Sequence, residues 1–155
     1  MTLTVFVIAI TMLTETGAAF SGQTRAADAD QRAKISKLPP AVRATVEAES
    51  KGRTIKGISS EKENGKTVYE LETLVGGRTR DLMIDAAGHV YLVEEQLDLE
   101  KAPAPVKAAM EARGTVLVLE SVVKNGKTTY EGQVRSKNGK KTAVEVDANG
   151  KPVKP

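Results

Sequence analysis

The side chains best suited to acid–base or metal chemistry are one histidine and two matched aspartates. His89 is the single histidine, and Asp85 and Asp147 each begin a D-A-x-G turn. A catalytic histidine needs a nucleophile and an orienting acid, whereas a histidine that binds zinc needs further histidines, cysteines or carboxylates. Lys151 stands at the position of His89 in the second turn. This indicates an exposed turn position that accepts any polar residue.

Two interpretations are open for Asp85 and Asp147: a pair of catalytic carboxylates, or acceptors for backbone N–H groups two residues further on. We favour the second, because it explains why both turns begin with aspartate. The chain has no cysteine, which excludes disulfides, thiolate metal sites and cysteine nucleophiles. It also lacks EF-hand, P-loop and G-x-G-x-x-G spacing. We therefore predict a protein that is not an enzyme and uses no metal and no cofactor.

A repeat sets the arrangement of the elements that carry these side chains. The letters NGKTVYE at 64–70 recur as NGKTTYE at 125–131. Asn-Gly favours a type I′ hairpin turn, because both central residues of that turn need positive φ. Further turn signals follow in each copy: GGR at 76 and DAAGH at 85, then NGK at 138 and DANGK at 147. Each copy therefore predicts a run of short antiparallel strands.

A short helix is predicted ahead of the strands in each copy. The segments LPPAVRATVEAESKG and APAPVKAAMEARG both begin with prolines, which suit the first helical turn, and both end in glycine, which suits the helix end. Apolar residues four apart give each helix one apolar stripe. The predicted stripe residues are Val42 and Val46 in the first helix, and Val106 and Met110 in the second.

These patterns predict an α+β fold made of two tandem repeats. Each repeat is a short helix packed on a four-stranded antiparallel meander, and the second is truncated at its last strand. The predicted divisions are a signal peptide at 1–19, a linker at 20–34, the first repeat at 35–98 and the second at 99–155.

The first fourteen residues, MTLTVFVIAITMLT, are uncharged and strongly apolar. This run is too short to span a bilayer comfortably and has the length of a signal-peptide apolar region, with Gly17 and Ala19 as a small-x-small cleavage site. A retained anchor and a buried N-terminal strand are the alternatives. We expect export to the periplasm or outside the cell, with no membrane contact after cleavage.

Alternation along the strands predicts which residues share a sheet face. Tyr69 and Tyr130 fall on the face under the helix, and Tyr91 is expected either between the repeats or at a ligand. The opposite face is expected to be more acidic and apolar in the first repeat and more basic in the second. Such a face either meets water or binds a partner. The candidate partner-binding residues are Val68, Glu70, Glu72, Asp81, Met83, Glu131, Gln133 and Arg135.

The order LPPAV or APAPV, then NGKTVYELET, then DLMIDAAGHV resembles the PepSY and PepSY-like domains, and the tandem arrangement is similar to the β-lactamase inhibitor proteins. The resemblance covers about residues 35–155. It implies an exported, non-catalytic bacterial module; some relatives restrain peptidases, and the inhibitors clamp an enzyme against a concave sheet. This chain has no Cys and no Trp, so no inhibitory residue is carried over.

We therefore predict an exported binding module that recognises a protein or peptide in the envelope or outside the cell, through its sheet face or by strand addition at an edge. A peptidase or another envelope enzyme is a candidate partner. The alternative is a structural or stress-related envelope protein without a dedicated partner. Nucleic acid is not expected, because the net charge is only +3 and acidic residues are interspersed with the basic ones.

Overall fold

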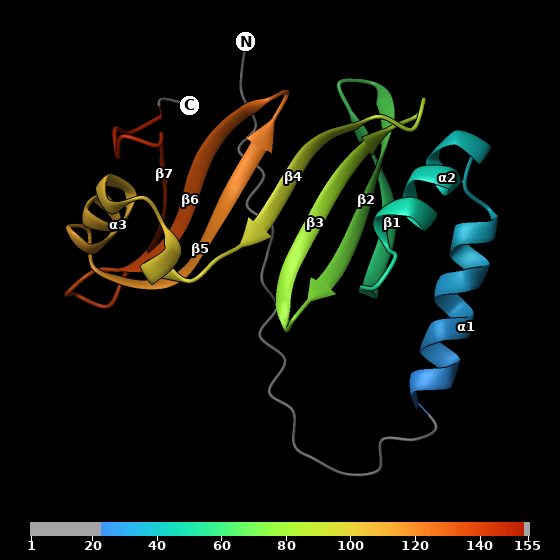
Figure 1. Cartoon of the computed structure of the whole chain (residues 1–155), viewed down its shortest axis with the longest axis horizontal. Helices are drawn as coiled ribbons and strands as arrows, with labels where there is room; N and C mark the ends of the chain where they lie inside the picture. The colour runs from blue at the N-terminus through green and yellow to red at the C-terminus, as the bar shows by residue number, and fades with distance from the viewer. Residues whose placement is uncertain (1–22, 154–155) are drawn as a thin grey trace.

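The computed structural model describes residues 23–153, so the predicted signal peptide lies outside the described residues. Seven strands form one antiparallel sheet in which every strand pairs with its neighbours in the sequence (Figure 1). The predicted α+β class is confirmed. The elements are α1 (Gln23–Ser36), α2 (Pro40–Glu49), β1 (Thr54–Glu63), β2 (Lys66–Val75), β3 (Arg78–Asp85), β4 (Val90–Gln96), η1 (Leu99–Lys101), α3 (Ala104–Glu111), β5 (Thr115–Lys124), β6 (Lys127–Arg135) and β7 (Lys141–Val146).

The same local geometry occurs in both halves of the sheet. Asn64 and Asn125 have φ of 50° and 51°, and the glycine after each also has positive φ, as a type I′ turn requires. The register of β1 with β2 shifts between Ile55 and Gly57, and that of β5 with β6 shifts between Val116 and Val118. Within residues 23–153, the fourth strand of the second half is reduced to an isolated bridge between Val146 and Pro152.

β4 and β5 join the two halves into one sheet. Leu92 pairs with Lys124 at one end of this seam, and Gln96 pairs with Glu120 at the other. The chain then crosses to the second half, where the Leu97 N–H donates to the Leu119 carbonyl over 2.9 Å. Leu97 and Leu99 pack against the second apolar core. The segment between the repeats therefore belongs to the packing of the second half.

Two apolar cores lie on the same face of the sheet, one under α2 and one under α3 (Figure 1). Val93 beside the first core pairs with Val123, which shares the face of Leu119 in the second. The predicted stripe residues are confirmed, since all four are fully buried, and Tyr69 and Tyr130 pack partly buried against the cores. The core residues of the first half are Val42, Val46, Leu71, Leu82 and Ile84, and those of the second are Val106, Met110, Leu119, Val134 and Val146.

The predicted linker differs from the structure, because most of it lies in helix α1. The segment QTRAADADQRAK is rich in alanine and in long polar residues, which have high helix propensity. Ile35 packs against the first core, and the Gln31 side-chain amide donates to the Lys56 carbonyl over 3.1 Å. Within residues 23–153, no helix is long and apolar enough to cross a bilayer.

Candidate functional site: the open face of the sheet

The surface opposite α2 and α3, here called the open face, runs across β1 to β7. Cross-strand partners in an antiparallel sheet point to the same side, so the register assigns its residues. On β2 and β3, Glu70 pairs with Met83 and Glu72 with Asp81. On β6 and β7, Glu131 pairs with Glu145. The open face therefore continues from the first repeat into the second within the described residues.

All of the predicted candidate residues lie on this one face, although they come from opposite halves of the sequence. Val68 is nevertheless only 5% exposed, so the prediction that it contacts a partner is wrong. Val68 pairs with Glu61 of β1, while Gln133 and Arg135 pair with Ala143 and Lys141 of β7. The role of the other candidates in binding stays a prediction, because no partner is present.

The centre of the open face holds two acidic residues that sequence reasoning did not single out, Glu94 and Glu120. Asp81 pairs with Glu94, and Glu120 pairs with Glu131. Alternation along β4 was a usable signal for Glu94, because it puts Glu94 on the side of the sheet opposite to Val93. The nearly continuous apolar run VLVLESVV in β5 conceals which side Glu120 occupies.

The second repeat has the expected basic side chains on the open face, but the centre of its face is acidic. There Glu120, Glu131 and Glu145 form a row across β5, β6 and β7. The basic side chains Arg135 and Lys141 pair at the last position of β6 and the first of β7, away from this row. The centre of the open face is therefore acidic in both repeats.

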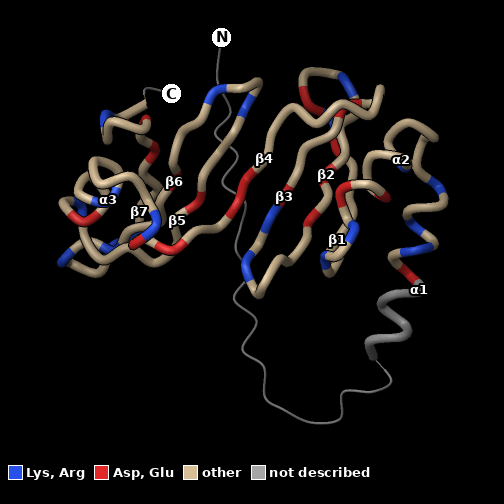
Figure 2. The backbone as a smooth tube through the Cα atoms, in the orientation of Figure 1, with Lys and Arg blue, Asp and Glu red and all other residues tan. Residues whose placement is uncertain are grey.

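Carboxylates thus stand opposite one another in two rows. Glu72, Asp81 and Glu94 form the row across β2, β3 and β4, and the second row crosses β5 to β7. Figure 2 shows acidic positions on β4 and on the strands beside it. Like charges directly opposite each other destabilise a sheet, so these rows are a cost to folding.

Burial and mutual repulsion raise the pKa values of these carboxyl groups. Burial, together with repulsion from Glu72 and Glu70, raises the pKa of Asp81 to about 7. Burial and repulsion from Glu120 likewise raise the pKa of Glu94 to about 7. The pKa values of Glu70, Glu120 and Glu131 are raised as well, chiefly by burial. Asp81 and Glu94 are therefore about half ionised near neutral pH.

Few groups of the protein itself satisfy these carboxylates. The Ser59 hydroxyl donates to Glu70 over 3.3 Å, and the buried Thr129 hydroxyl donates to Glu145 over 2.7 Å. Asp81 Oδ1 and Glu61 Oε1 are enclosed and have no hydrogen-bond partner. Within residues 30–153, no lysine or arginine forms an ion pair with either row of carboxylates.

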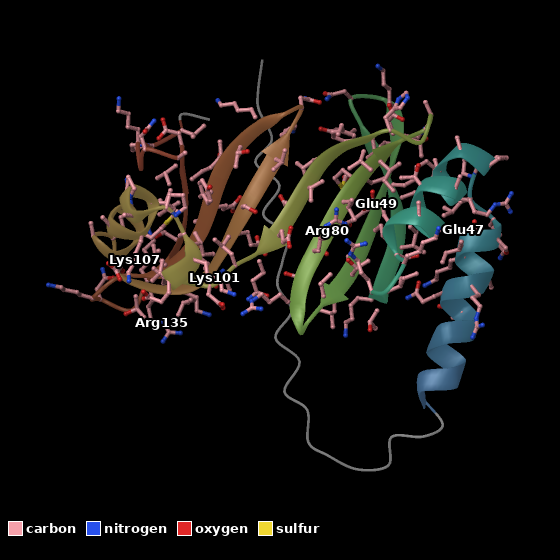
Figure 3. All side chains as sticks on the ribbon, in the orientation of Figure 1. Glu47, Glu49, Arg80, Lys101, Lys107 and Arg135 are labelled. Carbon is pink, nitrogen blue, oxygen red and sulfur yellow. The ribbon has the colours of Figure 1, made fainter. Side chains whose placement is uncertain are left out.

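Elsewhere the protein pairs its charges. Arg78 and Asp98 lie 2.6 Å apart, and so do Lys107 and Glu100. Arg80 of β3 reaches Glu49 of α2 on the helix-covered face, with 3.1 Å between the charged atoms (Figure 3). Among the described residues, the carboxylates of the two rows on the open face therefore differ from Glu49, Asp98 and Glu100, which do form ion pairs.

The two D-A-x-G turns have a structural role. Asp85 Oδ1 accepts hydrogen bonds from the backbone N–H groups of Ala87 and His89, both at 2.9 Å. Asp147 accepts from Asn149 and Lys151 at 2.8 and 3.0 Å. These bonds lower the pKa values of both aspartates. The interpretation as turn acceptors is confirmed.

His89 lies at the surface beside one of these aspartates. Its side chain is 78% exposed, with Nδ1 3.2 Å from Asp85 Oδ2. Within the part of the chain that the structure describes, no three histidine or acidic side chains are grouped so that they could hold a metal ion.

Tyr91 forms hydrogen bonds with both halves of the protein, one through its side chain and one through its backbone. Its hydroxyl donates to Glu63 Oε2 over 2.6 Å, within the first half, and its backbone carbonyl accepts from the Asn125 N–H across the seam over 2.9 Å. Burial and the bond to Glu63 raise the pKa of the phenol. The backbone of Tyr91 thus lies at the seam between the repeats, whereas its side chain belongs to the first half.

Comparison with known proteins confirms the resemblance and the fold. Residues 98–150 match the family model of the PepSY domain, described as the peptidase propeptide and YPEB domain. A Bacteroides eggerthii protein provisionally described as periplasmic is similar in structure, with a TM-score of 0.61, 17% identity and coverage of 76% of this chain and 86% of that one.

Two other solved structures are similar. A protein of the DUF2874 family from Bacteroides ovatus has a TM-score of 0.59 and 17% identity over 76% of this chain and 86% of its own. A BLIP-like protein from Bacteroides fragilis has a TM-score of 0.56 and 18% identity over 76% and 84%. Identities this low establish a shared fold alone. No curated protein matches the chain.

Proposed function

We propose that this protein is an exported, non-catalytic module that binds a protein or peptide through the open face. The observation that carries the proposal is that no helix within residues 23–153 covers that face, since α2 and α3 pack on the opposite side. The open face leaves the half-buried side chains of Met83 and Leu92 beside carboxylates without counter-charges. Exposed apolar side chains rimmed by polar ones mark many interaction surfaces.

The comparisons support export and binding in general terms. The PepSY match and the likeness to a BLIP-like protein are consistent with a domain that acts by contact and not by chemistry. The likeness to a protein provisionally described as periplasmic is consistent with export. A peptidase or another envelope enzyme is a reasonable partner for such a module.

The sheet edges are less favourable for strand addition than the face. β1 lies against α1, whose Gln31 uses the Lys56 carbonyl. Beside β7, the Val153 N–H donates to the Glu145 carbonyl over 3.1 Å. Parts of both edges are therefore already occupied by the protein itself, whereas strand addition needs a free row of backbone groups.

The test is affinity capture from an envelope extract with the immobilised protein and two variants. Met83→Arg places a bulky cation on the open face, and Val123→Arg places the same group on the helix-covered face, where Val123 is 36% exposed. We expect a protein that wild type and Val123→Arg retain and that Met83→Arg loses. Equal retention by both variants would remove the open face from consideration. Retention of nothing would favour the structural role in the envelope.

A further inference from the structure

Building on the proposed function, we propose that the open face binds a cationic segment of the partner, whose Lys or Arg side chains pair with Glu72, Asp81, Glu94, Glu120 and Glu131 across the seam between the repeats. These residues belong to five successive strands, β2 to β6. With strands about 4.8 Å apart, they span about 19 Å. An extended peptide of about six residues has that length.

The acidic open face is complementary in charge to a cationic partner. The chain has 23 basic and 20 acidic residues, so it does not lack cations. Yet its ion pairs among residues 30–153 lie in helices, turns and the helix-covered face, and none reaches these five carboxylates. Their mutual repulsion is retained in the free protein and would be relieved by positive charge from outside.

An independent observation comes from the enclosed oxygens. Asp81 Oδ1 and Glu61 Oε1 lack both a hydrogen-bond partner and solvent contact. Glu61 pairs with Val68 on the open face, so the two oxygens belong to the same surface. A buried acceptor without a donor costs free energy. A cation bound beside these carboxylates would offset part of that cost through its charge.

The spacing favours several separate cations over a metal ion. The carboxylates follow one another from strand to strand, and within the described residues no three of them are grouped closely enough to hold a metal. Met83 and Leu92 pair beside the first acidic row. Lysine and arginine pack their aliphatic stems on such apolar side chains while the charged ends reach carboxylates.

Binding of this kind is coupled to protons. A cation favours the ionised carboxylate, so a bound partner lowers the pKa values that burial and repulsion have raised in Asp81 and Glu94. The groups that face them are Glu70 and Glu72 of β2 and Glu120 of β5, with Glu131 of β6 beyond. Lys124 of β5, beside Leu92, is the nearest basic residue in the seam pairing. Affinity therefore rises between pH 5 and pH 8, and binding at pH 7 releases protons.

The experiment is calorimetric titration of the purified protein with nona-lysine, in two buffers of different ionisation enthalpy. The double variant Asp81→Asn/Glu94→Gln removes two central charges of the open face. The control Glu47→Gln/Glu111→Gln removes two charges from exposed positions of α2 and α3. We expect the open-face variant at pH 8 to bind about tenfold more weakly and to release fewer protons at pH 7, and the control to match wild type.

Two results would overturn this inference: no binding of nona-lysine by wild type, or equal weakening in both double variants, which would indicate attraction by net charge alone. The proposed function is tested separately by the captured protein. If Asp81→Asn/Glu94→Gln still captures a protein that Met83→Arg loses, the open face binds a partner and the cationic chemistry is rejected. If neither protein nor peptide binds, both proposals are rejected.

Discussion

Asp81 and Glu94 face each other across β3 and β4, and this placement links the stability of the fold to pH. Their pKa values are raised to about 7 in the folded state, so the folded protein keeps protons that the unfolded chain has already released. The contribution of these two groups to the free energy of unfolding is therefore fully present below about pH 4 and is lost as pH rises through about 7. Asp85, Asp98 and Asp147 act in the opposite direction at lower pH, because their pKa values are lowered.

Replacing Asp81 by asparagine should stabilise the protein at pH 8, because the amide carries no charge for Glu72 and Glu94 to repel. We expect a gain on the order of 1 kcal/mol, after a discount for solvent screening of this half-exposed group. The gain should shrink at pH 5, where the wild-type carboxyl is mostly protonated. Urea unfolding at both pH values measures it, with Glu47→Gln as the control. An equal gain at both pH values would contradict the pH linkage.

At the scale of elements, each D-A-x-G turn closes onto the helix of its own repeat. A Cβ at Gly88 would lie 2.7 Å from the Ala41 carbonyl oxygen, and one at Gly150 would lie 2.4 Å from that of Pro105. The Thr45 hydroxyl also donates to the Gly88 carbonyl over 2.6 Å. The glycine therefore lets the turn after the third strand pack directly against the start of the helix.

Alanine at Gly88 or Gly150 should cost more stability than alanine at Gly139. All three glycines have positive φ, of 87°, 74° and 84°, but only Gly139 has open space around its Cα. The left-handed backbone alone costs alanine about 1–2 kcal/mol, and the clash with helix backbone adds to it at the first two positions. Denaturant unfolding of the three variants tests this. Equal losses of stability in the three variants would mean that contact between turn and helix is not what makes glycine necessary.

At the scale of the whole molecule, one sheet carries two separate cores that are joined by the β4–β5 pairing and by Leu97 and Leu99. A repeat of this size buries little apolar surface alone. Excision of either half would leave a long seam strand without its partner. The two halves should therefore unfold together.

Leu119→Ala, in the second core, should lower the stability of the first half as well. Leu119 is 2% exposed, and truncation of a buried leucine typically costs 2–5 kcal/mol. Hydrogen exchange of the β2 and β3 amides should accelerate along with that of β6. The control Val123→Ala changes a partly exposed residue of the same strand. Unchanged protection in β2 and β3 would show that the halves open independently.

The sequence alone determined the features that depend on near neighbours along the chain. Asn-Gly pairs specify the hairpins through backbone conformation, prolines and glycines bound α2 and α3, and strict alternation assigns β2 and β6 to their faces. The matched aspartates were identifiable as turn acceptors because their hydrogen bonds span only a few residues.

Features that depend on contacts between distant segments emerge only once the chain has folded. α1 is held by Ile35 on the first core, a contact that the composition of the segment does not reveal. The acidic centre of the open face exists because the β4–β5 register brings Glu94 and Glu120 to the same side. β5 is apolar almost throughout, so its own sequence fits either orientation. The pairing of β4 with β5 selects one orientation of β5, and this orientation places Glu120 on the open face.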